Sequence, residues 1–308
     1  MGRTHGQHAV PLTFGFTLAL YVERLGSRIS YLKEANKNLT AKLSGAVGAY
    51  NASSLVVEDP LKLEADFALE LGLKPAAIAT QIVPPEPLAD LFHGYISAFG
   101  VIANLADDMR HLQRSEIGEI FEYFASTQVG SSTMPHKRNP WNFEHVKSLW
   151  KSFMPRMITV YMDQISEHQR DLTNSASERF YAEIVAGLCL AIDRINRVLS
   201  RLKVDEKAML KNFMQSSQMV IAEPLYILLA DSGHPDAHEC VRKLTLESQK
   251  TGKTLWALIE EDQKLFELLS VLPEEKLEII KDPSKYIGLS QEKALTICDK
   301  WQTLIEEV

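Results

Sequence analysis

The stretch that decides the fold reads, from Thr13 to Leu43, TFGFTLALYVERLGSRISYLKEANKNLTAKL. Its large apolar side chains recur at alternating intervals of four and three residues, with one polar residue among them. They are Leu18, Val22, Leu25, Ile29, Leu32, Asn36, Leu39 and Leu43. This heptad spacing predicts one long amphipathic helix. A helix of about 30 residues would be about 45 Å long, which is typical of a helix bundle.

Three further apolar patterns extend this arrangement. Spacings of three and four residues predict helices over residues 92–109, from Pro140 to about residue 168, and over residues 181–202. Pro155 lies inside the second of these and is expected to kink it. The loop-rich stretch that follows the first helix holds a short amphipathic piece near residues 61–71.

Few windows alternate in the way that strands do, so the sequence predicts an all-α fold. We expect a central long-helix bundle over residues 1–203, with a polar loop at residues 130–140. A smaller helical domain is expected over residues 204–308, where Gly and Pro punctuate shorter helices. The 308 residues suffice for two domains, each of roughly 100–200 residues.

The composition excludes several classes of protein. Against 40 Asp and Glu, the 33 Lys and Arg give a net charge of −7, which argues against a nucleic-acid-binding protein. The three cysteines lie far apart, so neither a disulfide framework nor a zinc site is indicated. We expect a cytoplasmic protein without metal, cofactor or membrane partner. The apolar runs fall short of the roughly 18 residues that a membrane-spanning helix needs.

Three polar segments interrupt the apolar helices. In residues 2–8, His5 can exchange a proton near neutral pH, although a solvated tail would also explain this segment. Residues 130–140 place cations and donors at a helix N-terminus, which suits a bound carboxylate, and the alternative is a linker with a basic tail. Residues 168–179 carry two arginines around hydroxyl side chains, which suits a phosphate, and the alternative is a capped helix start with a surface Arg–Glu pair.

These segments resemble the motifs of a known family. GSSTMPHKRNP at residues 130–140 is similar to the GSSxMPxKxNP signature of the fumarase/aspartase superfamily. GRTHGQHA at residues 2–9 and QRDLTNSASER at residues 169–179 resemble the histidine and nucleotide segments of its adenylosuccinate lyase branch. The TQ pair at residues 80–81 and SGAVGAYN at residues 44–51 resemble that branch too. The resemblance covers most of the chain.

The resemblance implies a β-elimination that releases fumarate in purine nucleotide biosynthesis. The substrates would be adenylosuccinate, which gives AMP, and the carboxamide ribotide SAICAR, which gives AICAR. Ser131 would be the base, and His5, oriented by Glu144, would be the acid. Lys137 and Asn139 would stabilise the aci-carboxylate intermediate.

The same resemblance implies a set of substrate-binding residues. Thr4, Gln81 and Ser132 would contact the succinyl part, with Arg138 as a further cation. Arg170, Ser175 and Arg179 would hold the phosphate and ribose region. The family works as a homotetramer in which three subunits contribute to each active site, and we expect the same of this protein.

Three departures from the family pattern bear on these expectations. The family usually has another domain before the histidine motif, so we expect this chain to be truncated, and weakly active or inactive alone. His145 stands where related enzymes often have Asn, which bears on a substrate contact. The prolines of residues 84–87 replace a more polar stretch and bear on the geometry behind Gln81.

Two other functions stay open at the level of sequence. One is a different fumarate-releasing lyase, such as argininosuccinate lyase, or the related carboxymuconate cycloisomerase. The arginines and hydroxyls of residues 170–179, suited to phosphate, argue against these. The other is a non-catalytic helical oligomerisation core. A scaffold would not need His5, Ser131, Lys137 and Glu144 together.

Overall fold

The computed structural model describes residues 1–124, 133–134 and 136–306. Helices dominate these residues, and the strands are two residues long, which confirms the all-α prediction. The first half of the chain forms β1 (Arg3–Thr4), β2 (Gln7–His8), α1 (Phe14–Lys37), β3 (Thr40–Ala41), α2 (Ser53–Val56), α3 (Pro60–Glu70), β4 (Lys74–Pro75), α4 (Glu86–Leu112), β5 (Ile120–Phe121), α5 (Trp141–Phe153) and α6 (Arg156–Met162).

The second half begins with the short 3-10 helix η1 (Glu178–Phe180). It continues with α7 (Tyr181–Leu199), β6 (Lys203–Val204), α8 (Glu206–Val220), α9 (Ala222–Asp231), α10 (Ala237–Thr251), α11 (Leu255–Glu261), α12 (Gln263–Ser270), α13 (Glu274–Lys281), η2 (Pro283–Lys285) and α14 (Ser290–Glu306).

The chain divides into two compact units. The first unit contains residues 1–22, 115–119 and 204–308, and the second contains residues 23–114 and 120–203. The predicted division into a central domain over residues 1–203 and a smaller domain over residues 204–308 stays a prediction.

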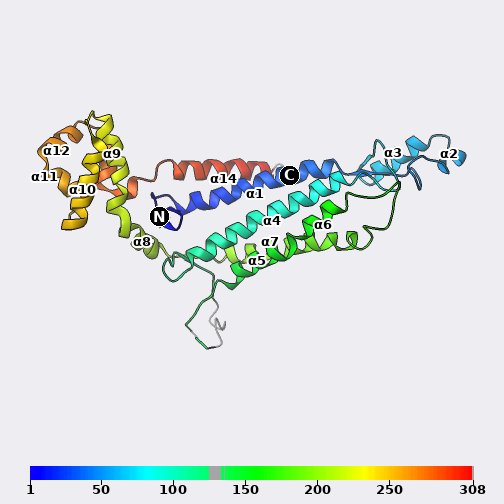
Figure 1. Cartoon of the computed structure of the whole chain (residues 1–308), viewed down its shortest axis with the longest axis horizontal. Helices are drawn as coiled ribbons and strands as arrows, with labels where there is room; N and C mark the ends of the chain where they lie inside the picture. The colour runs from blue at the N-terminus through cyan, green and yellow to red at the C-terminus, as the bar shows by residue number, and fades with distance from the viewer. Residues whose placement is uncertain (125–132, 135, 307–308) are drawn as a thin grey trace. The chain divides into compact units, whose positions relative to one another are not determined.

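The second unit is built around α4, α5 and α7, which pack side by side (Figure 1). Phe99, Met109 and Phe143 are fully buried there. Gly187 of α7 lets the helices approach closely, because a Cβ at this position would lie 2.4 Å from the ring of Phe153. By length and composition α4 could cross a membrane, but 61% of its apolar window is buried inside the protein, as in the core helix of a bundle.

Helix α1 is shorter than predicted and buries a different face. It ends at Lys37, because Thr40–Ala41 leaves the helix to pair in parallel with Lys74–Pro75. Small side chains such as Ala19 and Ala35 are buried. Val22 and Ile29, which belong to the predicted seam, are 37% and 47% exposed within the single chain. The heptad seam is therefore only partly covered within the single chain.

The predicted kinked helix after Pro140 is two helices. The proline nitrogen of Pro155 has no hydrogen to donate, so α5 ends at Phe153 and α6 starts at Arg156. Helix α6 ends at Met162, not near residue 168, because the carbonyl of Asp163 accepts a hydrogen bond from the side chain of Asn174 at 2.7 Å.

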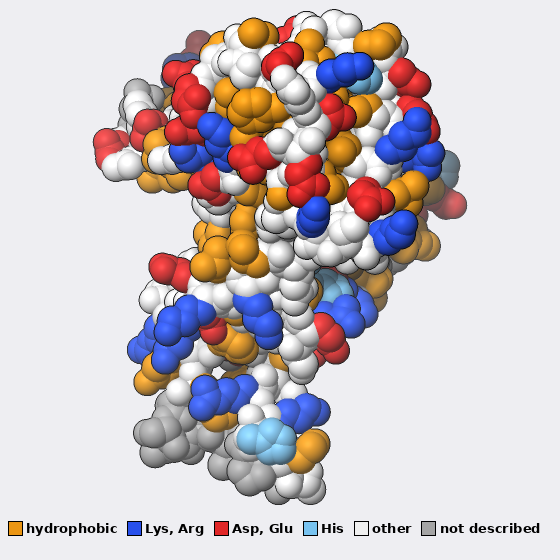
Figure 2. Space-filling view, turned by 90° about the vertical axis from the view of Figure 1, so that its left-hand side faces the viewer, with side chains coloured by type: hydrophobic (Ala, Val, Ile, Leu, Met, Phe, Trp, Pro, Cys, Tyr) orange, Lys and Arg blue, Asp and Glu red, His pale blue; other side chains and the backbone are white. Residues whose placement is uncertain are grey.

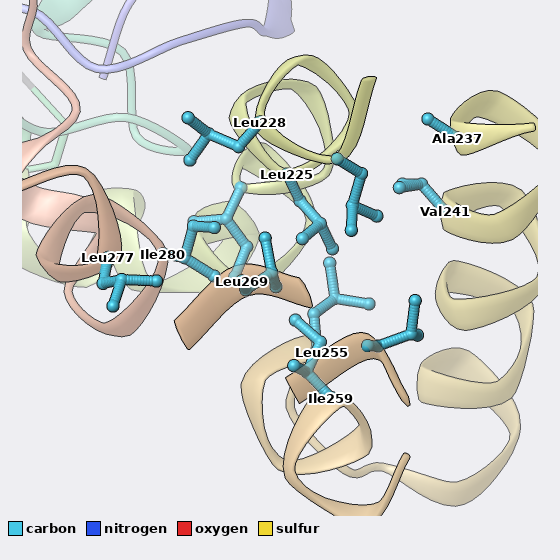
Figure 3. Packing of buried hydrophobic residues seen from close by; sticks show 12 residues of the cluster. Leu225, Leu228, Ala237, Val241, Leu255, Ile259, Leu269, Leu277 and Ile280 are labelled. Atoms are coloured by element: carbon cyan, nitrogen blue, oxygen red, sulfur yellow. The ribbon is translucent and has the colours of Figure 1, made fainter. Parts of the chain in front are cut away.

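The first unit has its own apolar core, formed by helices α9 to α13 (Figure 3). Leu225, Leu229, Leu255 and Ile259 are all fully buried in it. Each such side chain contributes roughly 1.5–3 kcal/mol by burial. On the face that Figure 2 presents, acidic and basic side chains are interspersed over the C-terminal helices.

Candidate functional site

The segment that carries Thr4 and His5 is a β-hairpin, not a loose tail. Strands β1 and β2 are antiparallel, with Arg3 opposite His8 and Thr4 opposite Gln7. His5 and Gly6 form the turn, with φ angles of 53° and 75°. Two consecutive positive φ angles are typical of a type I′ turn, whose twist matches that of the strands. The turn leaves the His5 side chain exposed.

A buried ion pair anchors this hairpin within the first unit. Two Arg3 nitrogens donate to the Glu119 carboxylate at 2.5 and 3.0 Å, and the two side chains are 15% and 4% exposed. Asn212 donates to the same carboxylate at 2.9 Å. Burial by itself would raise the pKa of Glu119, but these hydrogen bonds outweigh it and hold the pKa below its ordinary value.

The signature segment is described in part. The predicted base Ser131 and its neighbour Ser132 lie outside the described residues. The side chains of Lys137 and Arg138 are exposed, and Asn139 is half-buried. The Lys137 amide donates to the Met134 carbonyl at 3.0 Å, which makes a turn just before the cationic pair.

Two buried side chains hold the C-terminal end of this segment. Gln113, which follows α4, accepts a hydrogen bond from the Glu122 amide at 2.9 Å and donates to the Arg138 carbonyl at 3.2 Å. The Glu122 carboxylate accepts from the Asn142 side chain at 2.6 Å and from the Phe143 amide at 2.9 Å. We call Gln113 and Glu122 the loop clamp.

The loop clamp also fixes the start of α5. A carboxylate at a helix N-terminus satisfies amides that have no partner within the helix, and it interacts favourably with the helix dipole. Glu122 does this although it is only 6% exposed. Glu144 and His145 follow in the first turns of α5, and both side chains are exposed. The clamp therefore positions the described part of the signature segment relative to Glu144.

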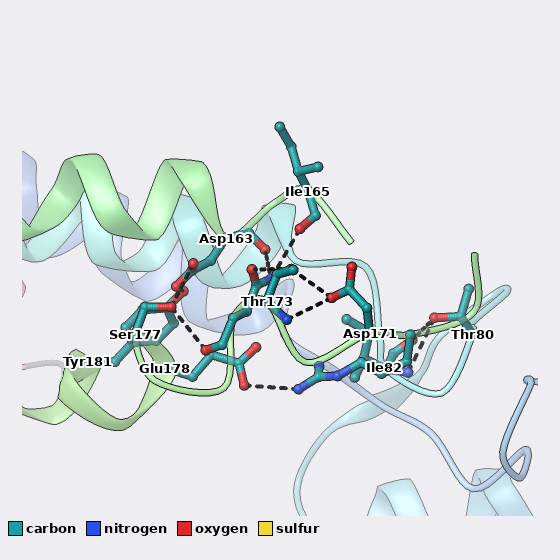
Figure 4. Close-up of polar contacts among 11 residues, drawn as sticks. Thr80, Ile82, Asp163, Ile165, Asp171, Thr173, Ser177, Glu178 and Tyr181 are labelled. Atoms are coloured by element: carbon teal, nitrogen blue, oxygen red, sulfur yellow. Dashed lines mark hydrogen bonds and ion pairs between the residues drawn. The ribbon is translucent and has the colours of Figure 1, made fainter. Parts of the chain in front are cut away.

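The nucleotide-like segment folds around Asp163 (Figure 4). The Asp163 carboxylate accepts hydrogen bonds from Ser177 at 2.8 Å and from Tyr181 at 2.6 Å. Burial raises the pKa of the Tyr181 hydroxyl, and this hydrogen bond raises it further. Asp171 accepts from the amide and the hydroxyl of Thr173 at 3.0 and 2.7 Å, which lowers the pKa of Asp171. These contacts give residues 163–181 a defined shape.

The predicted phosphate-binding residues occupy different environments. Arg170 is 19% exposed and pairs with Glu178 at 3.2 Å. The alternative interpretation of this segment predicts such a surface Arg–Glu pair. Ser175 is half-buried, and Arg179 in η1 is exposed. A bound anion would therefore compete with Glu178 for Arg170.

Two predicted motifs meet in the second unit. The Gln81 amide donates to the Gln169 carbonyl at 3.0 Å, so the TQ pair lies against the first residue of the QRDLT segment. Lys42 donates to the Thr80 carbonyl at 2.9 Å. Gly48, with φ 79°, approaches so closely that a Cβ would lie 1.9 Å from the Ala79 carbonyl oxygen. The SGAVGAYN motif therefore supports the same segment.

The predicted site residues are divided between the two units. Thr4 and His5 belong to the first unit, whereas Gln81, Lys137, Arg138, Asn139, Glu144, Arg170, Ser175 and Arg179 belong to the second. Within residues 1–124, 133–134 and 136–306, no group of three or more His, Cys, Asp and Glu side chains is arranged to hold a metal ion.

Several residues that shape the site were not predicted from the sequence. Gln113, Glu119, Glu122 and Asp163 are buried polar side chains at the ends of elements. The sequence gave no signal for them, because a single polar side chain outside a motif is usually solvated.

Comparisons with known proteins agree with the motifs. The sequence profile of the Lyase family matches residues 1–152, and the profile described as adenylosuccinate lyase C-terminal matches residues 166–287. An adenylosuccinate lyase of Pyrococcus abyssi is 35% identical over 304 residues, which cover 95% of this chain and 64% of that protein. An adenylosuccinate lyase of Methanothermobacter thermautotrophicus is 31% identical over 312 residues, which cover 98% of this chain and 68% of that protein.

The chain belongs to the adenylosuccinate lyase family. This confirms the resemblance that the motifs indicated. The chain spans about 64% of the length of the Pyrococcus abyssi adenylosuccinate lyase.

A solved structure supports the fold assigned to this adenylosuccinate lyase family member. The 3-carboxy-cis,cis-muconate lactonizing enzyme of Pseudomonas putida superimposes with a TM-score of 0.82 over 98% of this chain and 66% of that one. At 24% identity this likeness concerns the fold alone.

Proposed function

We propose that the chain is the catalytic part of an adenylosuccinate lyase. It would release fumarate from adenylosuccinate to leave AMP, and from SAICAR to leave AICAR. The observation that carries the proposal is the contact between Gln81 and Gln169, because it places the TQ motif against the QRDLT segment. Family membership supports the same reaction.

The chemistry requires a base, an acid and a place for developing negative charge. Ser131 removes the proton beside a carboxylate, and Lys137 and Asn139 stabilise the aci-carboxylate that results. His5 then protonates the leaving nitrogen, with Glu144 orienting the imidazole. A serine base requires Lys137 and the helix N-terminus to favour its alkoxide.

Substrate recognition divides between the two ends of the substrate. Thr4, Gln81, Ser132 and Arg138 contact the succinyl part. Arg170, Ser175 and Arg179 hold the phosphate and ribose. When the phosphate binds, Arg170 exchanges its contact with Glu178 for phosphate oxygens, which offer a stronger, bidentate partner.

The active assembly is a homotetramer in the cytoplasm, with each active site shared between subunits. Exposed apolar side chains along α1 support association, because Val22 and Ile29, seven residues apart on one face of the helix, are 37% and 47% exposed. A row of this kind on a long helix is typical of a subunit interface. Sedimentation analysis of the purified chain tests the tetramer.

Fumarate release from adenylosuccinate tests the proposed reaction. The assay uses enzyme in excess over substrate, and Lys137→Met is the variant. Arg242→Met is the matched control, since its exposed side chain pairs with Glu239 in the first unit. Loss of release in Lys137→Met alone supports the proposal, and equal rates in all three proteins contradict it.

Two further arms separate the competing functions. Release of fumarate from argininosuccinate, but not from adenylosuccinate, indicates the other lyase. A non-catalytic core predicts that adenylosuccinate leaves the melting temperature unchanged, because only a ligand that binds the native state raises it.

A further inference from the structure

A cavity of about 340 Å³ in the second unit has no assigned role. Its lining includes Tyr123, Trp141, Asn142, Arg194, Arg197 and Arg201. None of these residues belongs to the set proposed for fumarate release. The volume lies within the range of pockets that hold small ligands, roughly 300–1,000 Å³.

The three arginines converge because of their spacing along the chain. Arg194 and Arg197 lie one turn apart at the end of α7, and Arg201 lies in the turn that follows the helix. Basic side chains near a helix C-terminus interact favourably with the helix dipole. The helix dipole explains why arginines occur here. It does not explain the aromatic and amide side chains that orient these arginines around a cavity.

Neighbouring side chains hold the cations in place. Arg194 donates to the Asn142 side-chain oxygen at 2.9 Å, and its guanidinium carbon lies 5.4 Å from the centre of the Trp141 ring. The guanidinium carbon of Arg201 lies 5.8 Å from the centre of the Tyr123 ring, and the Lys203 nitrogen lies 5.6 Å from it. A guanidinium that rests on an aromatic ring keeps N–H groups at its edge for an anion.

The positive charge of this pocket is only partly compensated. Arg197 pairs with Asp193 at 2.6 Å. The carboxylate of Glu122 also lines the cavity and adds a second negative charge, although among the described residues its hydrogen bonds come from Asn142 and Phe143 and not from a cation.

Three cations remain without such a partner. In the part of the chain that the structure describes, none of Arg194, Arg201 and Lys203 forms an ion pair with a carboxylate. This group lies in a protein whose net charge is −7. A local excess of cations in a cavity attracts a compact multivalent anion.

We propose that this cavity binds a phosphate group, either inorganic phosphate or the phosphate of a small phosphate monoester. Guanidinium groups match phosphate geometry through paired N–H donors, and cations on several sides suit a tetrahedral dianion. The proposal does not depend on the proposed reaction, because no residue is shared between the two sites.

Calorimetric titration of the whole chain tests this site at low ionic strength. The probes are inorganic phosphate, ribose 5-phosphate and fumarate, with potassium chloride at matched ionic strength as the blank. Saturable phosphate binding is expected. In the double variant Arg194→Gln/Arg201→Gln the Kd is expected to rise about tenfold to a hundredfold, because charge-assisted hydrogen bonds are lost.

The matched control is Lys211→Gln/Lys250→Gln. It removes the same charge from two exposed lysines of the first unit and is expected to bind phosphate like the parent protein. Lys203→Gln is a second, milder variant, since its side chain lies over an exposed ring, and its Kd is expected to rise less. Circular dichroism and the melting temperature without ligand confirm that each variant is folded.

The outcomes separate the two sources of phosphate. Tighter binding of ribose 5-phosphate than of phosphate identifies a monoester, and equal binding identifies free phosphate. Three results overturn the proposal: no saturable binding above the chloride blank, equal weakening in the lysine control, or fumarate binding at least as tightly as phosphate.

Discussion

Replacing Arg3 by Met is expected to destabilise the first unit through the charge that it leaves behind. The Glu119 carboxylate, 4% exposed, would lose two hydrogen bonds and keep the one from Asn212. Removing one partner of a buried ion pair typically costs about 3–5 kcal/mol. Because Arg3 is 15% exposed, water can partly replace it, so we expect the lower end, about 3 kcal/mol.

Thermal and urea unfolding measure this loss. A cost of about 3 kcal/mol corresponds to a fall in melting temperature of roughly 6–12 °C by the scaling for domains of about 150–250 residues. The double variant Arg3→Met/Glu119→Gln removes the orphaned charge as well, and it is expected to recover most of the loss. A double variant that is no more stable than Arg3→Met would refute the reasoning, as would a loss below about 0.5 kcal/mol in Arg3→Met.

The same pair sets a pH dependence. The folded-state pKa of Glu119 lies below its ordinary value, because the hydrogen bonds from Arg3 and Asn212 outweigh burial. Its contribution to stability is therefore complete above the unfolded pKa, about 4.3, and is lost as the pH falls toward the folded pKa. Acid titration of the melting temperature is expected to show this loss in the parent protein and not in Glu119→Gln.

Three further predictions concern the second unit. Gln113→Leu is expected to speed trypsin cleavage after Lys137. Gln113→Glu is expected to give an intermediate cleavage rate, because it can still accept from the Glu122 amide but cannot donate to the Arg138 carbonyl. Equal cleavage rates would show that the clamp does not hold the segment. Gly48→Ala is expected to lower stability by more than about 1 kcal/mol in urea unfolding, because its Cβ meets the Ala79 carbonyl and its φ is 79°; an unchanged midpoint contradicts this. Tyr181→Phe is expected to cost about 1–2 kcal/mol, since the Asp163 carboxylate loses a donor, and equal stability would show that the bond contributes nothing.

Periodicity predicted the long helices well, because apolar spacing reports directly on which side chains are buried. It predicted less well which side chains of α1 are buried. Val22 and Ile29 repeat as a heptad, yet they are exposed within the single chain, while Ala19 and Ala35 are buried. A seam of large side chains marks a contact face, and the sequence does not say whether the partner of that face lies in the same chain.

Helix ends were predicted less well than helix centres, because tertiary contacts decide them. Parallel pairing of Thr40–Ala41 with Lys74–Pro75 ends α1, and these segments lie more than thirty residues apart in sequence. The hydrogen bond from Asn174 to the Asp163 carbonyl follows the end of α6 in the same way.

The candidate site was also predicted only in part. Its chemistry-bearing motifs were visible in the sequence, because GSSTMPHKRNP and QRDLT keep their spacing. The residues that hold those motifs were not visible. Gln113, Glu122 and Asp163 are single polar side chains, and their roles depend on burial and on partners from other elements.

Fumarate release from adenylosuccinate, compared between the parent chain and Ser131→Ala, tests the central claim most directly. The account predicts release by the parent chain that is abolished in the variant, while both proteins keep the same melting temperature. Release that continues unchanged in Ser131→Ala would contradict the assignment of the base. A parent chain that neither releases fumarate nor gains thermal stability from adenylosuccinate would contradict the proposed function itself.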